Sequence, residues 1–194
     1  LTYGWKVMHQ FDRIAQGKAP ANSLDAILAD RRLALPRGAN EMLFTSNHDE
    51  NSWLGTVFER LGGGIEPFAV LSMTLNGVPL IYNGQEAGLN KRLEFFQRDP
   101  INWQPSPLFD FYRKLIDLRK THPALRTGIP FHRVATTMDE SIYAFIRKAS
   151  DGRSVLVVAN LTAKDAEFVI GGPEVAGTWR SEERRVGKEC ATGC

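Results

Sequence analysis

The stretch that decides the fold class is Met42-Leu43-Phe44-Thr45-Ser46-Asn47-His48-Asp49. Residues 42–46 form a run that is too short for a helix and lacks polar alternation. Such a run is typical of a strand buried on both faces in a parallel sheet. The polar triplet 47–49 follows at the carboxyl end of this strand, where open α/β sheets and (β/α) barrels place their chemistry. The stretch therefore predicts an α/β fold with a polar site at a strand end.

A second buried strand is predicted at residues 78–82, with Pro79 near its start, where a missing hydrogen-bond donor is tolerated. The polar residues 83–86 leave its carboxyl end. Amphipathic helices are predicted over residues 5–16 and from an N-cap at Asn22, with Asp25 in capping-box position, to a point before Pro36. Two more are predicted, one from Pro67 to Asn76-Gly77 and one from Ser106-Pro107 to His122-Pro123. Helices that alternate with buried strands in this way indicate a parallel sheet.

The sequence period changes beyond about residue 128. Residues 141–147 alternate between apolar and polar, Asp151-Gly152 is a hairpin signal, and strands are predicted at residues 155–161 and 167–170. The chain is therefore predicted to continue into a small antiparallel β domain.

Composition excludes several classes of protein. The chain has 194 residues, 43% hydrophobic and 24% charged, which is typical of a globular protein with a sizeable core. A net charge of +2 does not favour a nucleic-acid partner. No stretch approaches the roughly 18 to 20 apolar residues of a membrane span, so no membrane partner is expected. Both cysteines, Cys190 and Cys194, lie at the extreme end, which predicts no disulfide framework and no metal site.

The C-terminal segment 180–194 is set apart from the rest of the chain. Residues 180–190 resemble the in-frame translation of a sequencing adapter, and the segment is interpreted as a non-native tail.

The residues at the two strand ends suggest several kinds of chemistry. Asn47, His48 and Asp49 offer an amide, an imidazole and a carboxylate, enough to hold sugar hydroxyls or to stabilise a developing positive charge. A structural alternative is that Asp49 or Asn51 caps the following helix and His48 is a satisfied structural histidine. Glu86 could add a second carboxylate at the same rim, or be a solvated or Arg-paired loop residue. No G-x-S-x-G, H-E-x-x-H or Walker motif occurs.

Residues 43–52 and 77–86 together closely resemble the alpha-amylase family, glycoside hydrolase family 13. In that family F-x-x-N-H-D lies at the end of the seventh barrel strand and G-x-P-x-I-Y-x-G-x-E forms the eighth strand and its exit, and both occur here in order. Residues 111–125 are similar to the family's last barrel helix, which leads into a C-terminal β-sandwich. The resemblance implies a partial (β/α)8 TIM barrel over residues 1–127, the start of a β-sandwich over 128–179, and the tail over 180–194.

The resemblance also implies roles for single residues. Asp49 would be the carboxylate that stabilises the sugar in the transition state, His48 a hydrogen-bond partner of the same sugar, and Asn47 a residue that orients the turn. The family's retaining mechanism needs a nucleophile and an acid/base about 5 Å apart, and both would lie upstream of this chain. No cofactor or metal ligand is expected in this segment, although calcium is possible in the full-length parent.

The resemblance thus predicts a C-terminal fragment of a retaining hydrolase that acts on α-1,4-glucosidic bonds of starch, maltodextrins or cyclodextrins, with an α-glucan oligosaccharide or polysaccharide as its partner. A complete barrel takes about 250 residues, more than the barrel part of this chain offers. The fragment alone is predicted to be inactive. A transglycosylase or isomerase of the trehalose-forming or branching type, and a non-catalytic binding relative, remain as alternatives.

Overall fold

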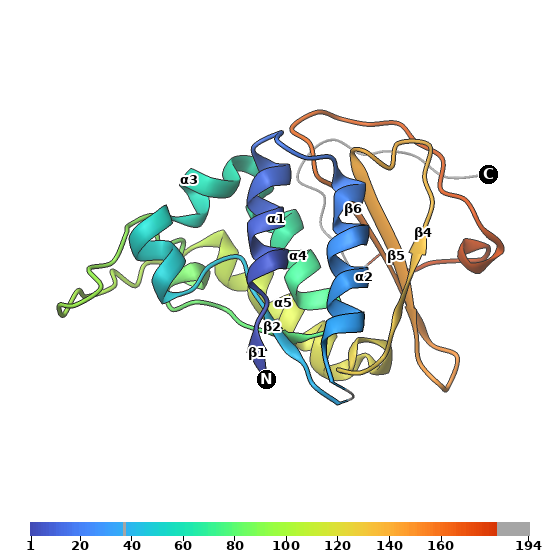
Figure 1. Ribbon diagram of the computed structural model, residues 1–194, viewed down its shortest axis with the longest axis horizontal. Coiled ribbons are helices and arrows are strands. Elements are labelled where there is room, and N and C mark those ends of the chain that lie inside the picture. Colours follow the sequence, from blue (N-terminus) through green and yellow to red (C-terminus); the bar gives the residue numbers. More distant parts are fainter. Residues whose placement is uncertain (37, 182–194) are drawn as a thin grey trace.

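The computed structural model describes residues 1–36 and 38–181 of the chain. Its main helices are α1 (Trp5–Ala15), α2 (Leu24–Ala34), α3 (Val57–Leu61), α4 (Ile65–Thr74) and α5 (Pro107–Thr121), and its strands are β1 (Thr2–Tyr3), β2 (Glu41–Leu43), β3 (Val78–Pro79), β4 (Phe131–Val134), β5 (Ile142–Lys148) and β6 (Ser154–Asn160). Figure 1 shows their arrangement. Apart from Arg180 and Ser181, the predicted non-native tail lies outside the described residues.

Strands β1, β2 and β3 form a parallel sheet in that order, with Tyr3 opposite Met42 and Leu43 opposite Pro79. The predicted strands 42–46 and 78–82 are too long at their carboxyl ends, because side chains take over the backbone groups there. The Arg60 guanidinium donates to the Thr45 carbonyl at 2.6 Å, and the Gln85 side chain accepts from the Tyr82 N–H at 2.7 Å. Pro79 is in the edge strand β3, where its missing N–H costs no ladder bond.

Two glycines let the backbone approach β2 closely from both sides. A Cβ on Gly4 would lie 2.7 Å from the Met42 carbonyl oxygen, and one on Gly77 would lie 2.8 Å from the Leu43 side chain and 2.9 Å from the Glu41 carbonyl oxygen. Any larger residue would push β1 or β3 away from β2. These glycines therefore allow the tight spacing of the parallel sheet.

The helices agree with the sequence except at the start of α2. Helix α1 ends before Gly17, and α5 begins after Ser106, whose hydroxyl accepts from the Leu108 N–H at 3.2 Å. The predicted N-cap at Asn22 is wrong, because Asn22 lies inside a 3-10 turn, Ala21–Ser23, that precedes α2. Asp25 instead accepts a hydrogen bond from the Tyr143 hydroxyl at 2.8 Å. None of the helices in the described part of the chain is long and apolar enough to cross a membrane.

Strands β4, β5 and β6 form the predicted antiparallel sheet, in that order. The chain reverses between β5 and β6 at the predicted Asp151-Gly152 turn, where Gly152 has a φ of +87° that suits glycine. The strand predicted at residues 167–170 is wrong, because only an isolated bridge between Thr136 and Ile170 forms there.

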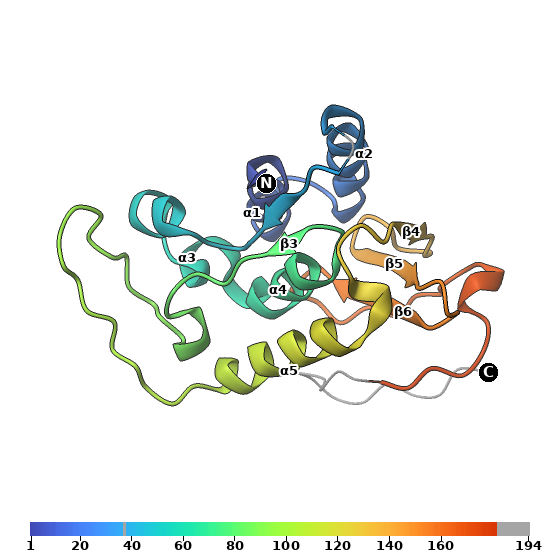
Figure 2. The same ribbon diagram turned by 90° about the horizontal axis from the view of Figure 1, so that it is seen from below.

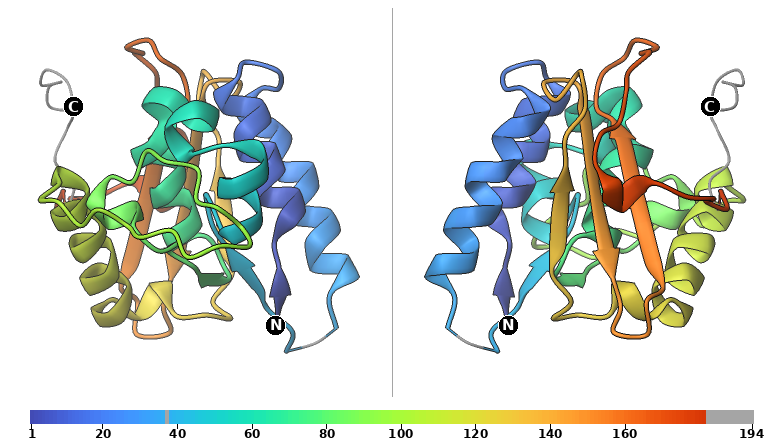
Figure 3. Two further views of the ribbon diagram at one scale, coloured as in Figure 1. Left: turned by 90° about the vertical axis from the view of Figure 1, so that its left-hand side faces the viewer. Right: turned by 90° about the vertical axis from the view of Figure 1, so that its right-hand side faces the viewer.

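One apolar core joins the helices to the antiparallel sheet. Phe11 and Phe68 pack with ring centroids 5.1 Å apart, and the same cluster includes Tyr143, Phe145 and Val157 of β5 and β6. Figure 3 shows β5 and β6 along one face of the molecule, with α1 and α2 on one side and α5 on the other. Helix α4 contacts β3, α5 and β6, so it links the two sheets. Strand β5 is buried on both faces, because Val134, Ala144 and Ile146 form a second cluster behind it.

Candidate functional site

The segments that follow β2 and β3 meet at one end of the molecule. Because the two strands are parallel neighbours, their carboxyl ends share an edge of the sheet. The chain after β2 enters a short π-helix, Glu50–Leu54, and the chain after β3 enters a 3-10 turn, Gln85–Ala87, and then a long loop. Figures 1 and 2 show this loop beside the π-helix region, at the end of the molecule away from the antiparallel sheet.

His48 and Asp49 lie next to each other on this rim. His48 Nε2 and Asp49 Oδ1 are 3.5 Å apart, and the side chains are 54% and 40% exposed. Asp49 occupies the N-cap position of the π-helix, but its side chain makes no capping hydrogen bond. The Asn47 side chain takes the structural role instead, since its Oδ1 accepts from the Glu50 N–H at 2.9 Å. The Asp49 carboxylate is therefore left accessible from solvent, and Asn47 orients the turn.

Buried polar atoms without hydrogen-bond partners gather around the same strand ends. Of the six such side-chain atoms in residues 1–36 and 38–181, four are here: Ser46 Oγ, Asn47 Nδ2, Glu50 Oε2 and Glu86 Oε2. The other oxygen of Glu50, Oε1, is 3.4 Å from His9 Nε2. Buried polar groups are normally paired, so this concentration makes the strand ends a candidate site.

Arg60 bonds to the backbone on both sides of His48 and Asp49, at Thr45 and at Gly55. This role was not predicted from the sequence. Its guanidinium is buried and donates to both oxygens of Asp12 at 2.7 and 2.9 Å, to the Gly55 carbonyl at 2.9 Å and to the Thr45 carbonyl at 2.6 Å. Burial raises the pKa of Asp12, and the Arg60 charge opposes that shift. The position of Asp12 could have indicated a buried ion pair, because Asp12 lies one helical turn after Met8, at the border of the apolar stripe of α1.

Gln85 is a second bracing residue that the sequence analysis missed. Its Nε2 donates to Thr45 Oγ1 at 2.8 Å and to the Tyr112 hydroxyl at 3.2 Å, and its Oε1 accepts from the Tyr82 N–H. The residue thus ties the ends of both strands to α5. Burial raises the pKa of Tyr112 to about 12.

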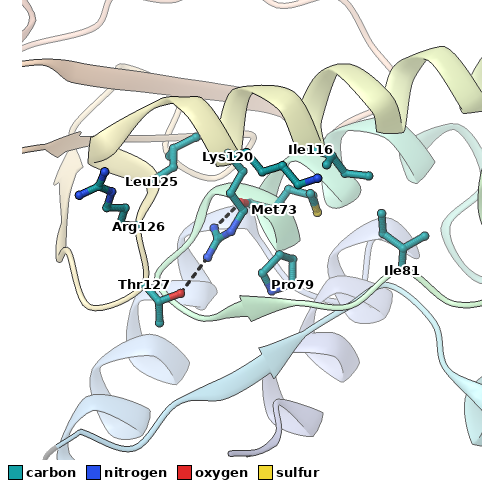
Figure 4. A pocket seen from close by; sticks show the side chains of 9 residues that line it. Met73, Pro79, Ile81, Ile116, Lys120, Leu125, Arg126 and Thr127 are labelled. Carbon is teal, nitrogen blue, oxygen red and sulfur yellow. Dashed lines mark hydrogen bonds between the residues drawn. The ribbon is translucent and has the colours of Figure 1, made fainter.

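Glu86 does not contact the His48–Asp49 pair but lines a neighbouring cavity of about 320 Å³ with Trp103, Phe109 and Asp110. It is half-buried, and its Oε2 is buried without a hydrogen-bond partner among the described residues. A larger pocket of about 440 Å³ lies between Pro79 and Ile81, at and beyond the end of β3, and Ile116, Arg119 and Lys120 of α5 (Figure 4). Neither lining includes His48 or Asp49. Across the described residues, no three His, Cys, Asp or Glu side chains are grouped so as to hold a metal ion.

Comparison with known proteins relates the chain to one group of enzymes. No family model matches it. It is 32% identical over 144 residues to alpha-amylase 2 of Dictyoglomus thermophilum, covering 66% of this chain and 24% of the relative. It is 31% identical over 199 residues to neopullulanase 2 of Thermoactinomyces vulgaris, covering 91% of this chain and 33% of the relative. The chain thus spans about a quarter to a third of the length of these curated relatives.

The structure leads to the same group. The fold matches the crystal structure of a maltogenic alpha-amylase, AmyB from Thermotoga neapolitana, with a TM-score of 0.74 and 22% identity. The match covers 89% of this chain and 40% of that one. By sequence and by fold, the chain belongs to the alpha-amylase family, glycoside hydrolase family 13, and corresponds to a C-terminal part of its members.

Proposed function

We propose that this chain is the C-terminal part of a retaining α-glucan hydrolase, with Asp49 as the carboxylate that stabilises the transition state and His48 as a hydrogen-bond partner of the same sugar. The observation that carries the proposal is the exposed His48–Asp49 pair at the carboxyl end of β2. Curated relatives that match the chain are named alpha-amylase, neopullulanase and cyclomaltodextrinase. The proposed architecture is part of a (β/α)8 barrel followed by the start of a β-sandwich.

The role proposed for Asp49 follows from its charge and from the absence of a capping hydrogen bond to its side chain. Glycoside hydrolysis passes through an oxocarbenium-like transition state, in which positive charge develops on the sugar. A carboxylate fixed beside that charge stabilises the transition state more than the ground state. Because Asn47 orients the turn and Asp49 does not cap the helix, the Asp49 carboxylate is available for this interaction. His48 offers ring nitrogens, which can hydrogen-bond sugar hydroxyls.

The remaining catalytic groups are proposed to lie outside this chain. A retaining mechanism needs a nucleophile and an acid/base, and we assign neither role to Asp49. The chain covers a quarter to a third of the curated relatives it matches, which leaves most of a complete enzyme to supply them. The chain by itself is therefore expected to be inactive.

The proposed substrate is an α-glucan such as starch, a maltodextrin or a cyclodextrin. Solved structures that share the fold are described in complex with maltose and maltotriose. These matches have 17% and 18% identity to this chain, so they support the substrate class only together with the curated relatives.

The proposal is tested with the complete protein of which this chain is proposed to be the C-terminal part. That protein should release reducing sugar from maltodextrin, and nuclear magnetic resonance of the first product should show retention of the α configuration. The 194-residue chain assayed in parallel should release none. Inversion of configuration, or an inactive complete protein, would refute the proposal, and sugar transfer without net hydrolysis would favour the transglycosylase alternative.

A further inference from the structure

His9 of α1 is the one side chain in the described part of the chain that pairs with the buried carboxylate of Glu50. Glu50 directly follows Asp49, and its side chain is 6% exposed, whereas the His9 side chain is 51% exposed. Glu50 Oε1 lies 3.4 Å from His9 Nε2, and Glu50 Oε2 has no hydrogen-bond partner among the described residues. A buried carboxylate is unfavourable unless it is paired, so Glu50 depends on this contact.

The backbone of Glu50 closes the turn that carries His48 and Asp49. The Glu50 N–H donates to Asn47 Oδ1 at 2.9 Å, just before the pair. The Glu50 carbonyl accepts from the Gly55 N–H at 2.9 Å, at the end of the π-helix. Because side chain and backbone belong to the same residue, a shift of the Glu50 carboxylate would strain both bonds and displace the neighbouring Asp49.

The His9 ring is held in place from its own helix. It lies 6.1 Å from the Trp5 ring, one helical turn earlier, at an interplanar angle of 31°. Trp5 in turn packs edge-on against Phe44, the residue that follows β2, with ring centroids 5.5 Å apart. Helix α1 therefore presents the imidazole to Glu50 from a fixed position beside the end of the strand.

From these contacts we infer that His9 is a positioning residue for the proposed reaction: by pairing with Glu50 it fixes the turn from which Asp49 projects. The inference rests on the proposed function of Asp49 and extends it to a residue of α1, 41 positions before Glu50 in the sequence. A carboxylate stabilises a transition state only when it is held in the productive geometry, and a misplacement of about 1 Å can lower a rate roughly 100-fold. His9 acts through Glu50, without contact with the sugar.

The alternative is that the His9–Glu50 pair only stabilises the fold, and the exposure of His9 argues against that role. About half of the His9 side chain is in contact with solvent, where water screens a polar contact and reduces what it adds to stability. A small shift of an aligned carboxylate has a much larger effect on a rate than on stability. Substitution of His9 is therefore expected to change kcat while the fold persists.

The inference is tested by the kinetics of His9 variants of the complete protein on maltodextrin. His9→Phe keeps a ring beside Trp5 but has no nitrogen for Glu50, so kcat should fall about tenfold while KM changes little. His9→Ala, which adds no bulk, should give the same fall. His9→Gln offers an amide donor to Glu50 and should retain most of kcat. Lys6→Ala is the matched control on α1, since Lys6 pairs with Asp30, and it should keep wild-type kinetics.

A double-mutant cycle decides whether His9 acts through Asp49. In the Asp49→Asn background, His9→Phe should lower kcat by less than about twofold, because the carboxylate that the pair positions is already absent. A role in stability alone would lower kcat equally in both backgrounds.

Three results would overturn the inference: wild-type kcat in His9→Phe, a His9→Gln variant as slow as His9→Phe, or an equal fall of kcat with and without the Asp49 carboxylate. Each of them leaves the proposed function standing, provided that Asp49→Asn alone lowers kcat. If Asp49→Asn alone keeps a near-normal kcat, the proposed role of Asp49 fails, and the inference about His9 fails with it.

Discussion

The parallel strands β1, β2 and β3 pair over two residues at each junction, whereas β5 and β6 pair over the full seven residues of each strand. The antiparallel sheet is thus held by its own ladder and by the core on both faces of β5. In the parallel sheet, the Arg60 and Gln85 side chains bond to backbone groups beyond the ends of the short strand pairs. In the parallel region, side chains of Asn47, Arg60 and Gln85 fix the backbone after the strands. The candidate site lies in this region.

Each region contains a buried arginine, and the two guanidinium groups have different hydrogen-bond partners. Arg60 in the parallel region pairs with the Asp12 carboxylate. Arg147 of β5 donates to the carbonyls of Thr74, Arg126 and Ile129 at 2.6 to 2.8 Å, and no carboxylate among residues 1–36 and 38–181 pairs with it. Burial, together with the nearby Arg119 charge, lowers the pKa of Arg147 to about 10.

The largest expected effect comes from breaking the Arg60–Asp12 pair. Arg60→Met should lower the free energy of unfolding by about 3 to 5 kcal/mol, because it leaves a buried carboxylate without its partner. The loss should be smallest at acid pH, below the ordinary carboxyl pKa, and should grow as pH rises and Asp12 has to ionise in the folded state. Urea unfolding at several pH values measures it.

A double-mutant cycle separates the two arginines. Asp12→Asn should recover part of the loss in the Arg60→Met background, since it removes the unpaired charge. The same substitution should add independently to Arg147→Met, because Arg147 and Asp12 share no partner. Equal coupling in both backgrounds would contradict the distinction between the two regions.

A smaller effect is expected from crowding the parallel sheet. Gly77→Ala should destabilise the fold by about 1 to 3 kcal/mol, because the new Cβ would meet Leu43 and the Glu41 carbonyl. Gly63→Ala is the matched control, since a Cβ there meets nothing within 4 Å. Thermal unfolding that shifts equally in both variants would show that β2 and β3 are not closely packed.

The smallest expected effect concerns the loop after β3, where Arg92 pairs with Glu59. Hydrogen bonds from Arg92, and one from the Thr56 backbone N–H, lower the pKa of Glu59 to about 2. Because the folded pKa is depressed, this contact stabilises the loop above the ordinary carboxyl pKa and is lost as pH falls toward about 2. Amide exchange at residues 90–95, corrected for its intrinsic rate, should therefore rise between pH 5 and pH 3. The Glu59→Gln variant should show a smaller rise, and the part that remains should come from Asp99, whose pKa is lowered by its hydrogen bonds from Lys91 and from the Glu94 N–H.

The sequence predicted the helices better than the strand ends, for a physical reason. Helices α1 and α5 follow from local patterns, an apolar stripe closed by Gly17 and a Ser106 cap. The parallel strands end early because Arg60 and Gln85, distant along the chain, take their backbone groups. No periodicity in residues 42–46 encodes that contact. A capping box at Thr56 and Glu59 was also missed.

The sequence predicts which residues form the candidate site, and their roles stay a prediction, but it does not predict what surrounds them. The motif at residues 43–52 pointed to His48 and Asp49, and the structure places them together on the rim of the sheet. The loop after β3 folds back onto the π-helix through Asn51 and Ser52. Such a contact joins segments about 40 residues apart, and no local pattern encodes it.

The most direct test of the account is the kinetic effect of Asp49→Asn in the complete protein. The account predicts that kcat on maltodextrin falls about 100- to 1000-fold while KM changes little, because the charge acts mainly in the transition state. Asp151→Asn, which changes a similarly exposed carboxylate in the β5–β6 turn, should keep wild-type kinetics. A near-normal kcat in Asp49→Asn, with the fold intact, would contradict the assignment of Asp49.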